Sequence, residues 1–493
     1  MQESPANVRL WSTRLPNFYS QQIKGHPLAW MIGVSILILF LCSSLRHALF
    51  QSTGWDLGIF DQAIYLISQG QPPISSLIKV HILGDHAAWV FYPLALLYKI
   101  YPNVHWLFLV QSTALALGAL PTWHLARLAG LREGQAIALA AVYLLYPVIF
   151  NANLFDFHPE VMAVPALLAA VLAARLNQVV WFCLAIILVL GCKFILALTV
   201  AALGFWLLVF EKKRLCGVLA IVAGIAWFII ATKVILPIFN PQQMTSISRY
   251  GYLGNSIFEI AQNLFLKPRA IFQVVLSLDN LKYLILVFGP VIWGLSLQNL
   301  IPLIPAIPAL ALNLLADYQP QKDIVAQYSL PIVPFLMLAV IATLADGRGW
   351  LRSQRAMVLW SLMFFLVFAR WSYFFTKYLP TIDTWQATRE AIALIQTQGG
   401  VYTTNEIVPH LSHRPLIERT VTTEPQDLNQ FEYVLLNLRH PGSNSSPEFA
   451  AQLVEQLQQA PQFQQRYQRD GVILFQKATQ SLAIANFITL LIE

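Results

Sequence analysis

"PLAWMIGVSILILFLCSSLRHALFQSTGWDLGIFDQ", residues 27–62, joins a long apolar run to a short segment that carries two carboxylates. The apolar run, 28–47, is long enough for a helix to cross the hydrocarbon core of a bilayer, which is roughly 30 Å thick. Asp56 and Asp61 follow it, at the point where the chain would leave the membrane. The segment therefore predicts a membrane helix with acidic residues at its exit.

Similar apolar runs recur through all but the last fifth of the chain. The 493 residues are 57% hydrophobic and only 11% charged, a composition typical of a polytopic membrane protein. We expect a mainly α fold, a bundle of about eleven transmembrane helices. The predicted helices are 28–47, 104–127, 135–151, 158–175, 179–190, 193–210, 215–237, 281–297, 299–315, 328–345 and 356–377.

The short basic loops predict the orientation of the bundle. The segments "RLAGLREG" (127–134), "EKKR" (211–214) and "DGRGWLRSQR" (346–355) fall on one side if the helices alternate, and basic loops face the cytoplasm. The N-terminal segment 1–27 shares that side, and the loop 48–103 falls on the outer side. Because these basic residues serve topology, the net charge of +7 indicates no nucleic-acid partner.

The C-terminal part, 380–493, differs from the rest of the chain in its charge and in its pattern of apolar residues. It holds 7 Lys and Arg against 11 Asp and Glu, which leaves a net charge of +11 on the rest of the chain. "WQATREAIALIQTQ" (385–398) has helical spacing, whereas "GGVYTTN" (399–405) and "FEYVLLNL" (431–438) are typical of strands. We therefore divide the chain into the segment 1–27, a transmembrane domain 28–379 and a small α/β extracytoplasmic domain 380–493.

The outer side gathers acidic and histidine side chains. The loop 48–103 predicts two amphipathic helices, one over 57–69 after Asp56 and one starting near His86. The other candidates come from "GDH" (84–86) and "NANLFDFHPE" (151–160): Asp85, His86, Asp156, His158 and Glu160. Such a set offers either a general base or ligands for a divalent ion such as Mg²⁺ or Mn²⁺, and spacing does not choose between them.

Each of these residues also has an ordinary structural interpretation. Asp56 and Asp85 could cap the helices that follow them, because Asp is a preferred N-cap residue. Asp61 fits a solvated helix face or a supporting role beside Gln62. "FHPE" is a normal helix start, with Pro early and Glu in the first turn. The cluster of three such segments on one side favours a functional site.

Cations follow in the later outer segments. "SISRYGYLGNS" (246–256) places Arg249 beside Tyr250, and Lys193 stands at the turn between two predicted helices. Arg is suited to binding phosphate through two hydrogen bonds, so Arg249, Tyr250 and Lys193 are candidates for a phosphate site. Anchoring to lipid headgroups is the alternative interpretation.

At these motifs the chain resembles a bacterial membrane family known as domain of unknown function 2079. The resemblance covers roughly residues 30–380. The matching stretches are "DLGIFDQ" (56–62), "GDH" (84–86), Pro121 with "HLA" (124–126), "FDFHPE" (155–160), "RYGYLG" (249–254) and the Pro-rich stretch 304–334.

In architecture that family is similar to the GT-C glycosyltransferases, which are polyprenol-dependent membrane enzymes. The resemblance implies a bacterial inner-membrane location, an N-terminus in the cytoplasm and a catalytic carboxylate just after the first helix. By position that role falls on Asp56. The chain departs from the family at Phe194-Ile195, where acids often follow the lysine, and at Gln327 before Tyr328, where His-Tyr is frequent.

The expected function is transfer of a sugar from a polyprenyl-phosphate-linked donor to an unknown acceptor at the outer face of the membrane. Asp56 would act as base with Asp85 and His86 near it, and Arg249, Lys193 and Tyr250 would bind the donor phosphate. Asp156, His158 and Glu160 would hold the acceptor or a metal ion, supported by Asp61, Gln62, Gln327 and Tyr328. The alternatives are a transporter or flippase and a non-catalytic assembly protein; the scarcity of midplane ionisable residues favours the enzyme.

Overall fold

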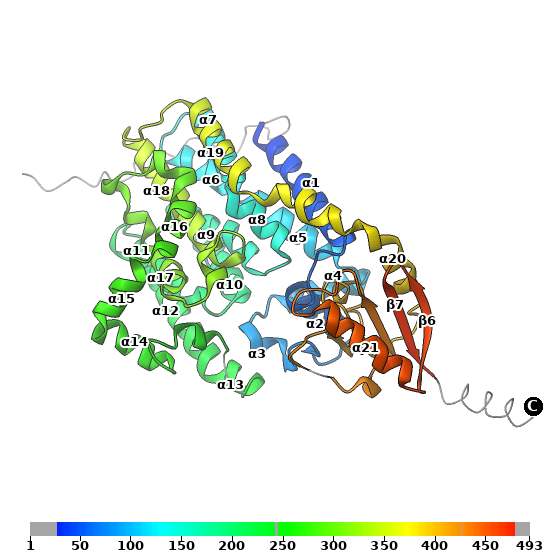
Figure 1. The fold of residues 1–493 in the computed structure, drawn as a ribbon. Helices are drawn as coiled ribbons and strands as arrows, with labels where there is room; N and C mark the ends of the chain where they lie inside the picture. The colour runs from blue at the N-terminus through cyan, green and yellow to red at the C-terminus, as the bar shows by residue number, and fades with distance from the viewer. Residues whose placement is uncertain (1–26, 242–244, 425, 479–493) are drawn as a thin grey trace, which may run out of the picture.

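The computed structural model describes residues 27–241, 245–424 and 426–478. The chain forms a large helical body and, beside it, a smaller unit that holds a five-stranded sheet (Figure 1). Of the predicted segment 1–27, only Pro27 is described, and the apolar end of the chain, 481–493, lies outside the described residues. The predicted fold class, mainly α with a small C-terminal α/β part, is confirmed.

The first helix, α1 (Pro27–Ala48), shows why the body belongs in a membrane. Trp30 is 70% exposed and Leu37 is 56% exposed, on a helix of 22 residues. An apolar face of this length is stable only against lipid or another apolar surface. Arg46 and His47, at the end of the same helix, are buried instead. The helix thus exposes apolar side chains along its length, as a lipid-facing helix does, and its polar end is buried in the protein.

Within the described residues, five helices are long and apolar enough to cross a membrane, or seven if each of two bent pairs counts as one crossing. Four shorter apolar helices lie in the same body. The predicted count of eleven crossings therefore stays a prediction. One predicted helix, 135–151, is divided at Pro147, because proline lacks the N–H that would continue the first helix.

The helices of the body follow one another along the chain, with the longest interruption between α1 and α5. The first loop, residues 49–104, holds α2 (Ile59–Ser68), α3 (Ile82–His86), α4 (Phe91–Ile100) and the two-stranded pair β1 (Ile74–Ser75) and β2 (Val80–His81). After it come α5 (His105–Leu117), α6 (Ala119–Leu128), α7 (Glu133–Leu144), α8 (Pro147–Phe155), α9 (Glu160–Arg175), α10 (Val179–Cys192), α11 (Leu196–Val209), α12 (Arg214–Ile230) and α13 (Leu236–Phe239). The remainder are α14 (Ile257–Leu266), α15 (Pro268–Val275), α16 (Leu278–Phe288), α17 (Ile307–Leu315), α18 (Val333–Ala345) and α19 (Gln354–Phe368).

Small residues bring α11 and α12 into close contact. A Cβ added to Gly204 would lie 2.6 Å from the carbonyl oxygen of Gly217 on the facing helix. Helix pairs in membranes associate through such close backbone approach, since lipid supplies no hydrophobic driving force between them. The turn before α11 holds Lys193.

Helices form at both expected places in the first loop, as α2 and α4, but α4 begins at Phe91 and exposes apolar side chains, with Leu96 59% and Ile100 74% exposed. The expectation that Asp85 caps a helix is wrong, because Asp85 lies inside α3. The cap there is His81, whose Nδ1 accepts a hydrogen bond from the Leu83 N–H at 3.2 Å. Asp56 is also no simple cap, because it lies within a π-helical turn, Gly54–Gly58, that leads into α2.

The C-terminal α/β unit, residues 385–477, is built on a sheet with strand order β4-β3-β5-β7-β6. β3 is parallel to β4 and β5, whereas β7 is antiparallel to β5 and β6. β3 and β5 lie within the two predicted strand segments. Its elements are α20 (Trp385–Ala393), β3 (Val401–Thr403), β4 (Ile417–Arg419), β5 (Tyr433–Asn437), α21 (Pro447–Gln459), β6 (Phe463–Arg469) and β7 (Val472–Lys477).

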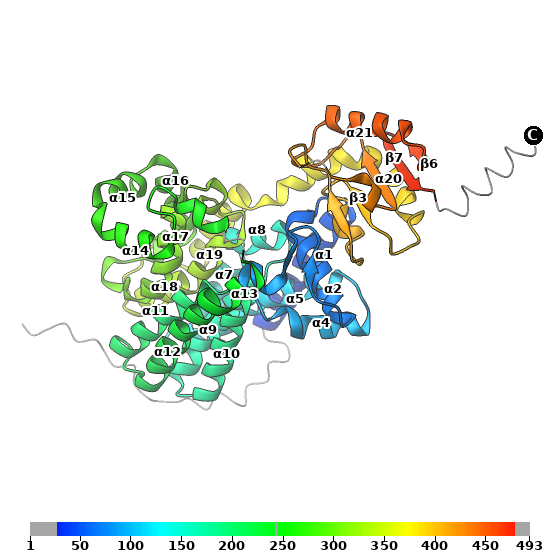
Figure 2. The same cartoon turned by 90° about the horizontal axis from the view of Figure 1, so that it is seen from below.

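This unit packs against the first loop, and the two views agree on it (Figures 1 and 2). The Gly54 N–H donates to the Asn405 carbonyl oxygen at 2.9 Å. A Cβ at Gly54 would lie 2.8 Å from the Val408 Cβ, so the contact requires glycine. Ser76 donates to the Ile417 carbonyl oxygen at 2.6 Å and accepts from the Ile417 N–H at 3.0 Å. The unit therefore holds the loop that carries Asp56.

Candidate functional site

Asp56 and His158 form a pair between the first loop and the start of α9. His158 Nε2 lies 3.4 Å from Asp56 Oδ1, and the Asp56 side chain keeps 25% of its surface exposed. The imidazole itself is buried, with the Phe155 ring stacked on it at 5.3 Å and the Phe60 ring edge-on at 5.6 Å. The predicted base is thus a partly exposed carboxylate whose other side is held by a buried histidine.

Asp156 has a different position from Asp56, although both are acids of the same cluster. Its carboxylate is buried and forms a two-pronged ion pair with Arg46 from the end of α1. Thr53 adds two hydrogen bonds to Asp156 Oδ2, from its N–H at 3.1 Å and its hydroxyl at 3.0 Å. Asp156 therefore ties α1 to the segment that leads to Asp56, and its oxygens are occupied by protein groups.

Glu160 and Lys193 form a second buried pair. Lys193 Nζ lies 2.7 Å from Glu160 Oε1, with side-chain exposures of 12% and 4%. His86 is close to this pair and to Asp85, whose Oδ1 lies 3.3 Å from His86 Nδ1. Burial lowers the pKa of His86 and favours its neutral imidazole. Glu160 is near enough to both His86 and His158 to interact electrostatically with each, so the Asp85–His86 pair belongs to the same cluster as His158.

Arg249 continues the polar chain from Lys193. The ammonium of Lys193 lies 5.8 Å from the centre of the Tyr328 ring, and the Tyr328 hydroxyl accepts from Arg249 at 3.3 Å. Arg249 also donates to Gln321 Oε1 at 3.2 Å and stacks over the Tyr318 ring at 4.2 Å. No Asp or Glu among the described residues pairs with Arg249. Its charge is therefore available to an anion.

The other two predicted residues of this region are Tyr250, whose hydroxyl is hydrogen-bonded within the protein, and Gln327, whose side-chain oxygen has no partner among the described residues. The Tyr250 hydroxyl donates to the Leu312 carbonyl oxygen at 3.0 Å and accepts from Gln321 Nε2 at 3.0 Å. It therefore fixes Arg249 rather than pointing freely into a site. Gln327 is buried, and its Oε1 has no hydrogen-bond partner in the described part of the chain.

Asp61 and Gln62 do not belong to this cluster. The expectation that Asp61 is solvated is wrong, because its side chain is 1% exposed, accepts hydrogen bonds from Tyr98 and Ser412, and lies 3.1 Å from His413 Nε2. Burial raises the pKa of Asp61, but these three partners outweigh burial and hold it below its usual range. Gln62 is buried beside it and donates to the Arg414 carbonyl oxygen at 3.0 Å. Both residues bind the C-terminal α/β unit to the first loop.

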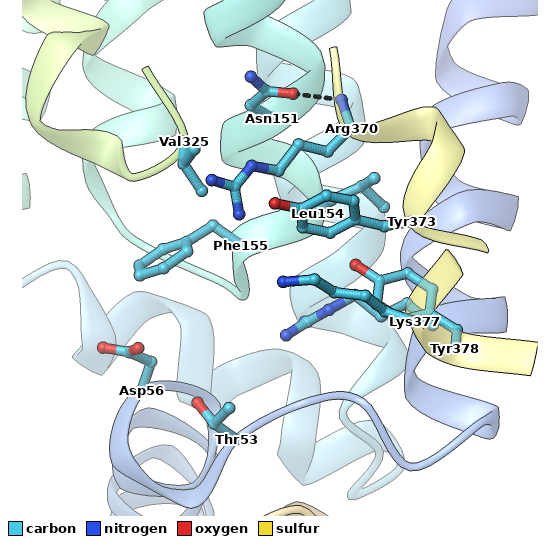
Figure 3. Close-up of a pocket in the computed structure, with 11 residues that line it drawn as sticks. Thr53, Asp56, Asn151, Leu154, Phe155, Val325, Arg370, Tyr373, Lys377 and Tyr378 are labelled. Carbon is cyan, nitrogen blue, oxygen red and sulfur yellow. Dashed lines mark hydrogen bonds between the residues drawn. The ribbon is translucent and has the colours of Figure 1, made fainter. Parts of the chain in front are cut away.

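A pocket of about 210 Å³ opens next to Asp56. Figure 3 shows Arg370 and Lys377 on the wall across from Asp56, with the Tyr373 ring between the two cations. Arg46 and Thr53 also line it, through the Asp156 anchor described above. The pocket thus places one carboxylate opposite two cations that the sequence-based prediction left inside its last apolar helix.

A signal for these missed cations does exist in the sequence. Arg370 and Lys377 are seven residues apart in "RWSYFFTK", a spacing of two helical turns that would put both on one face of a helix. Ionisable residues in an apolar run usually mark a functional surface. Arg419 on β4 was also missed; it stacks over the Trp55 ring at 4.2 Å, beside Asp56, and only the fold brings it there.

The donor set does not fit the predicted divalent ion. Among the described residues, no three His, Cys, Asp or Glu side chains come together in a group that could hold a metal. Each buried acid faces a basic partner instead: Asp156 faces Arg46, and Glu160 faces Lys193. Metal binding stays a prediction.

Comparisons with known proteins agree with this architecture. A family model described as "Predicted membrane protein (DUF2079)" matches residues 46–474. Among solved structures, ArnT from Cupriavidus metallidurans bound to undecaprenyl phosphate has a TM-score of 0.50 and 14% identity, over 91% of this chain and 97% of that chain. ArnT in the apo state gives a TM-score of 0.49 at 14% identity over the same shares. No curated protein matches the chain. At this identity the likeness shows a shared fold alone.

Proposed function

This chain belongs to the DUF2079 family of predicted membrane proteins. We propose that it transfers a sugar from a polyprenyl-phosphate-linked donor to an acceptor hydroxyl. The fold similarity to ArnT, crystallised with undecaprenyl phosphate, supports a lipid phosphate as part of the donor. Transfer takes place at the outer face of the bacterial inner membrane, with the basic loops and the N-terminus in the cytoplasm. The C-terminal α/β unit then lies outside the cytoplasm.

The observation that carries the proposal is the Asp56–His158 pair at the edge of the pocket. Asp56 is exposed enough to receive a proton, and the buried His158 ring holds the carboxylate in one orientation. A general base must reach the proton that it removes. Among the described residues that line the pocket, only Asp56 carries a carboxylate. Asp156 and Glu160 are committed to Arg46 and Lys193.

In the reaction, Asp56 takes the proton of the acceptor hydroxyl. The acceptor oxygen forms a bond to the anomeric carbon of the sugar, and the bond from that carbon to the phosphate oxygen breaks. The leaving group is the polyprenyl phosphate, whose developing negative charge needs a fixed cation near it. The products are the glycosylated acceptor and the lipid phosphate.

Arg249 is the cation best arranged to receive the donor phosphate. Its guanidinium is held by Tyr328 and Gln321 and has no carboxylate partner among the described residues. Lys193, by contrast, is paired with Glu160. Its role is to help position Tyr328, because its ammonium lies over the Tyr328 ring. Asp56 is near enough to act electrostatically on Tyr318, the ring under Arg249.

The test is sugar transfer by the purified full chain in lipid nanodiscs, given polyprenyl-phosphate sugars and hydroxyl acceptors. Asp56→Asn removes the base and keeps the shape, so we expect turnover to fall on the order of 1000-fold, within the usual range for general base catalysis. The matched control is Asp279→Asn, an exposed acid on α16 whose side chain is 52% exposed. Equal turnover by the Asp56 and Asp279 variants contradicts the proposal, and movement of an intact lipid-linked substrate across the bilayer would identify a transporter instead.

A further inference from the structure

The pocket beside Asp56 contains two cations that share one aromatic ring. The Arg370 guanidinium lies 4.5 Å from the centre of the Tyr373 ring, and the Lys377 ammonium lies 4.3 Å from it. In Figure 3 the ring stands between the two side chains, and the Lys377 amine points toward the interior of the pocket. A single ring attracts each cation, but it does not cancel their mutual repulsion.

The protein supplies little negative charge to balance this pair. Arg370 lies 3.4 Å from Asp323 Oδ2, a side chain that is 42% exposed, and such contacts contribute little. No Asp or Glu within the described ranges pairs with Lys377. The third cation of the pocket, Arg46, is already neutralised by Asp156. The wall of the pocket across from Asp56 therefore carries Lys377 without an acidic partner among the described residues, next to Arg370, whose partner Asp323 is exposed.

We propose that Arg370 and Lys377 bind a phosphate group of the acceptor, at a site distinct from the donor phosphate at Arg249. The Arg fork matches two phosphate oxygens, and the Lys ammonium adds a compact charge that a dianion satisfies. The acceptor role rests on the proposed function, whereas the phosphate site rests only on the pocket. The acceptor is thus a phosphorylated molecule, either a lipid headgroup or a soluble phosphate ester.

The placement of Asp56 explains why this site suits the acceptor. Asp56 lines the same pocket as Arg370 and Lys377, so a molecule held there by its phosphate presents its hydroxyl groups to the carboxylate. The pocket, at about 210 Å³, has room for a phosphate and a few attached atoms, so the rest of the acceptor extends outside. The donor phosphate approaches from the Arg249 and Tyr318 side.

The experiment counts phosphate ligands on the full chain by native mass spectrometry and measures their affinity. The probes are undecaprenyl phosphate, a short-chain phosphatidic acid and glycerol 3-phosphate. Each probe is tested alone. Phosphatidic acid and glycerol 3-phosphate are also tested in the presence of undecaprenyl phosphate. The variants are Lys377→Met, Arg370→Gln and Arg249→Gln. Lys282→Met is the control, because Lys282 is an exposed lysine on α16 that lies 3.8 Å from Asp279.

We expect wild type to hold undecaprenyl phosphate together with one of the two other probes. Lys377→Met and Arg370→Gln should each weaken that second probe about tenfold, as expected for one lost charged hydrogen bond. They should leave the affinity for undecaprenyl phosphate unchanged. Arg249→Gln should weaken the binding of undecaprenyl phosphate and leave the affinity for the second probe unchanged. Preference for phosphatidic acid identifies a lipid headgroup as the source, and preference for glycerol 3-phosphate identifies a soluble ester.

Two results would overturn the inference. One is that Lys377→Met and Arg370→Gln bind the second probe as the Lys282→Met control does. The other is that they lose undecaprenyl phosphate instead, which would make this pocket the donor site. Because binding is measured without turnover, absence of sugar transfer would count against the proposed function and leave this phosphate site standing.

Discussion

The Asp61 carboxylate, in the first turn of α2, accepts a hydrogen bond from the Ser412 hydroxyl, 351 residues further along the chain. Tyr98 donates to the other oxygen, and His413 Nε2 lies 3.1 Å from the first. A buried carboxylate with three partners joins the first loop to the C-terminal α/β unit. Since Asp56 lies one turn before Asp61, this junction also sets the position of the candidate base.

Asp61→Asn should weaken this junction. The variant loses the negative charge that His413, Ser412 and Tyr98 all face, and a hydrogen bond to a buried charge is worth about 2 kcal/mol. We expect a lower unfolding temperature and faster proteolysis between the body and the α/β unit. Asp279→Asn, an exposed acid, is the control. Identical melting of the Asp61 and Asp279 variants would show that the junction does not depend on the charge.

His410 should make the protein less stable in acid. Its ring stacks on His47 at 3.9 Å, and burial lowers the pKa of His410 to about 4. The unfolded chain takes up this proton near pH 6.5 and the folded chain only near pH 4. His410 therefore removes about 2 kcal/mol of stability between pH 7 and pH 5.

The measurement is the unfolding temperature of wild type and His410→Phe across that range, with the steeper fall expected in wild type. His413 acts with the opposite sign: although burial lowers its pKa, Asp61 outweighs burial and raises it. The stability that His413 contributes is complete below its unfolded pKa and is lost as the pH rises through the raised value. His413 is present in both proteins, so its contribution cancels in the difference between them. Parallel pH curves would contradict the prediction.

Glu160 and Lys193 should show strong energetic coupling. Lys193→Met leaves the Glu160 carboxylate buried without its partner, which typically costs about 3–5 kcal/mol. The double variant Glu160→Gln with Lys193→Met removes both charges and should recover most of the lost stability. A double-mutant cycle on unfolding free energies checks this, and additive losses would mean that the two groups act independently.

His158 should affect the rate of transfer more than substrate binding. His158→Gln removes the ring that lies 3.4 Å from Asp56 Oδ1 and lets the carboxylate rotate. We expect kcat to fall on the order of 100-fold with little change in KM for donor or acceptor. Steady-state kinetics on both substrates separates the two effects. A rise in KM at constant kcat would assign His158 to substrate binding instead.

Most of the candidate cluster could be predicted because its members lie at helix starts and turns. Asp56, His158 and Glu160 follow or precede apolar runs, so one topology puts them on one side, and the structure brings them into a chain that ends at Arg249. The sequence did not show that neighbouring acidic residues have different surroundings in the fold. Asp56 and Asp61 share one short segment, yet one lines a pocket and the other is buried under the C-terminal α/β unit.

The class of this protein could be assigned from the amino-acid sequence: its apolar runs are long enough to need a bilayer, and its last fifth alternates as an α/β unit does. These are local properties, set by hydrophobicity and periodicity along the chain. Which polar groups are neutralised and which are free depends on the folded chain. Asp156 meets Arg46 across 110 residues and Lys193 meets Glu160 across 33, while Lys377 meets no acid among the described residues. Charge pairing depends on distance in space, so the unpaired cations became visible only in the folded chain.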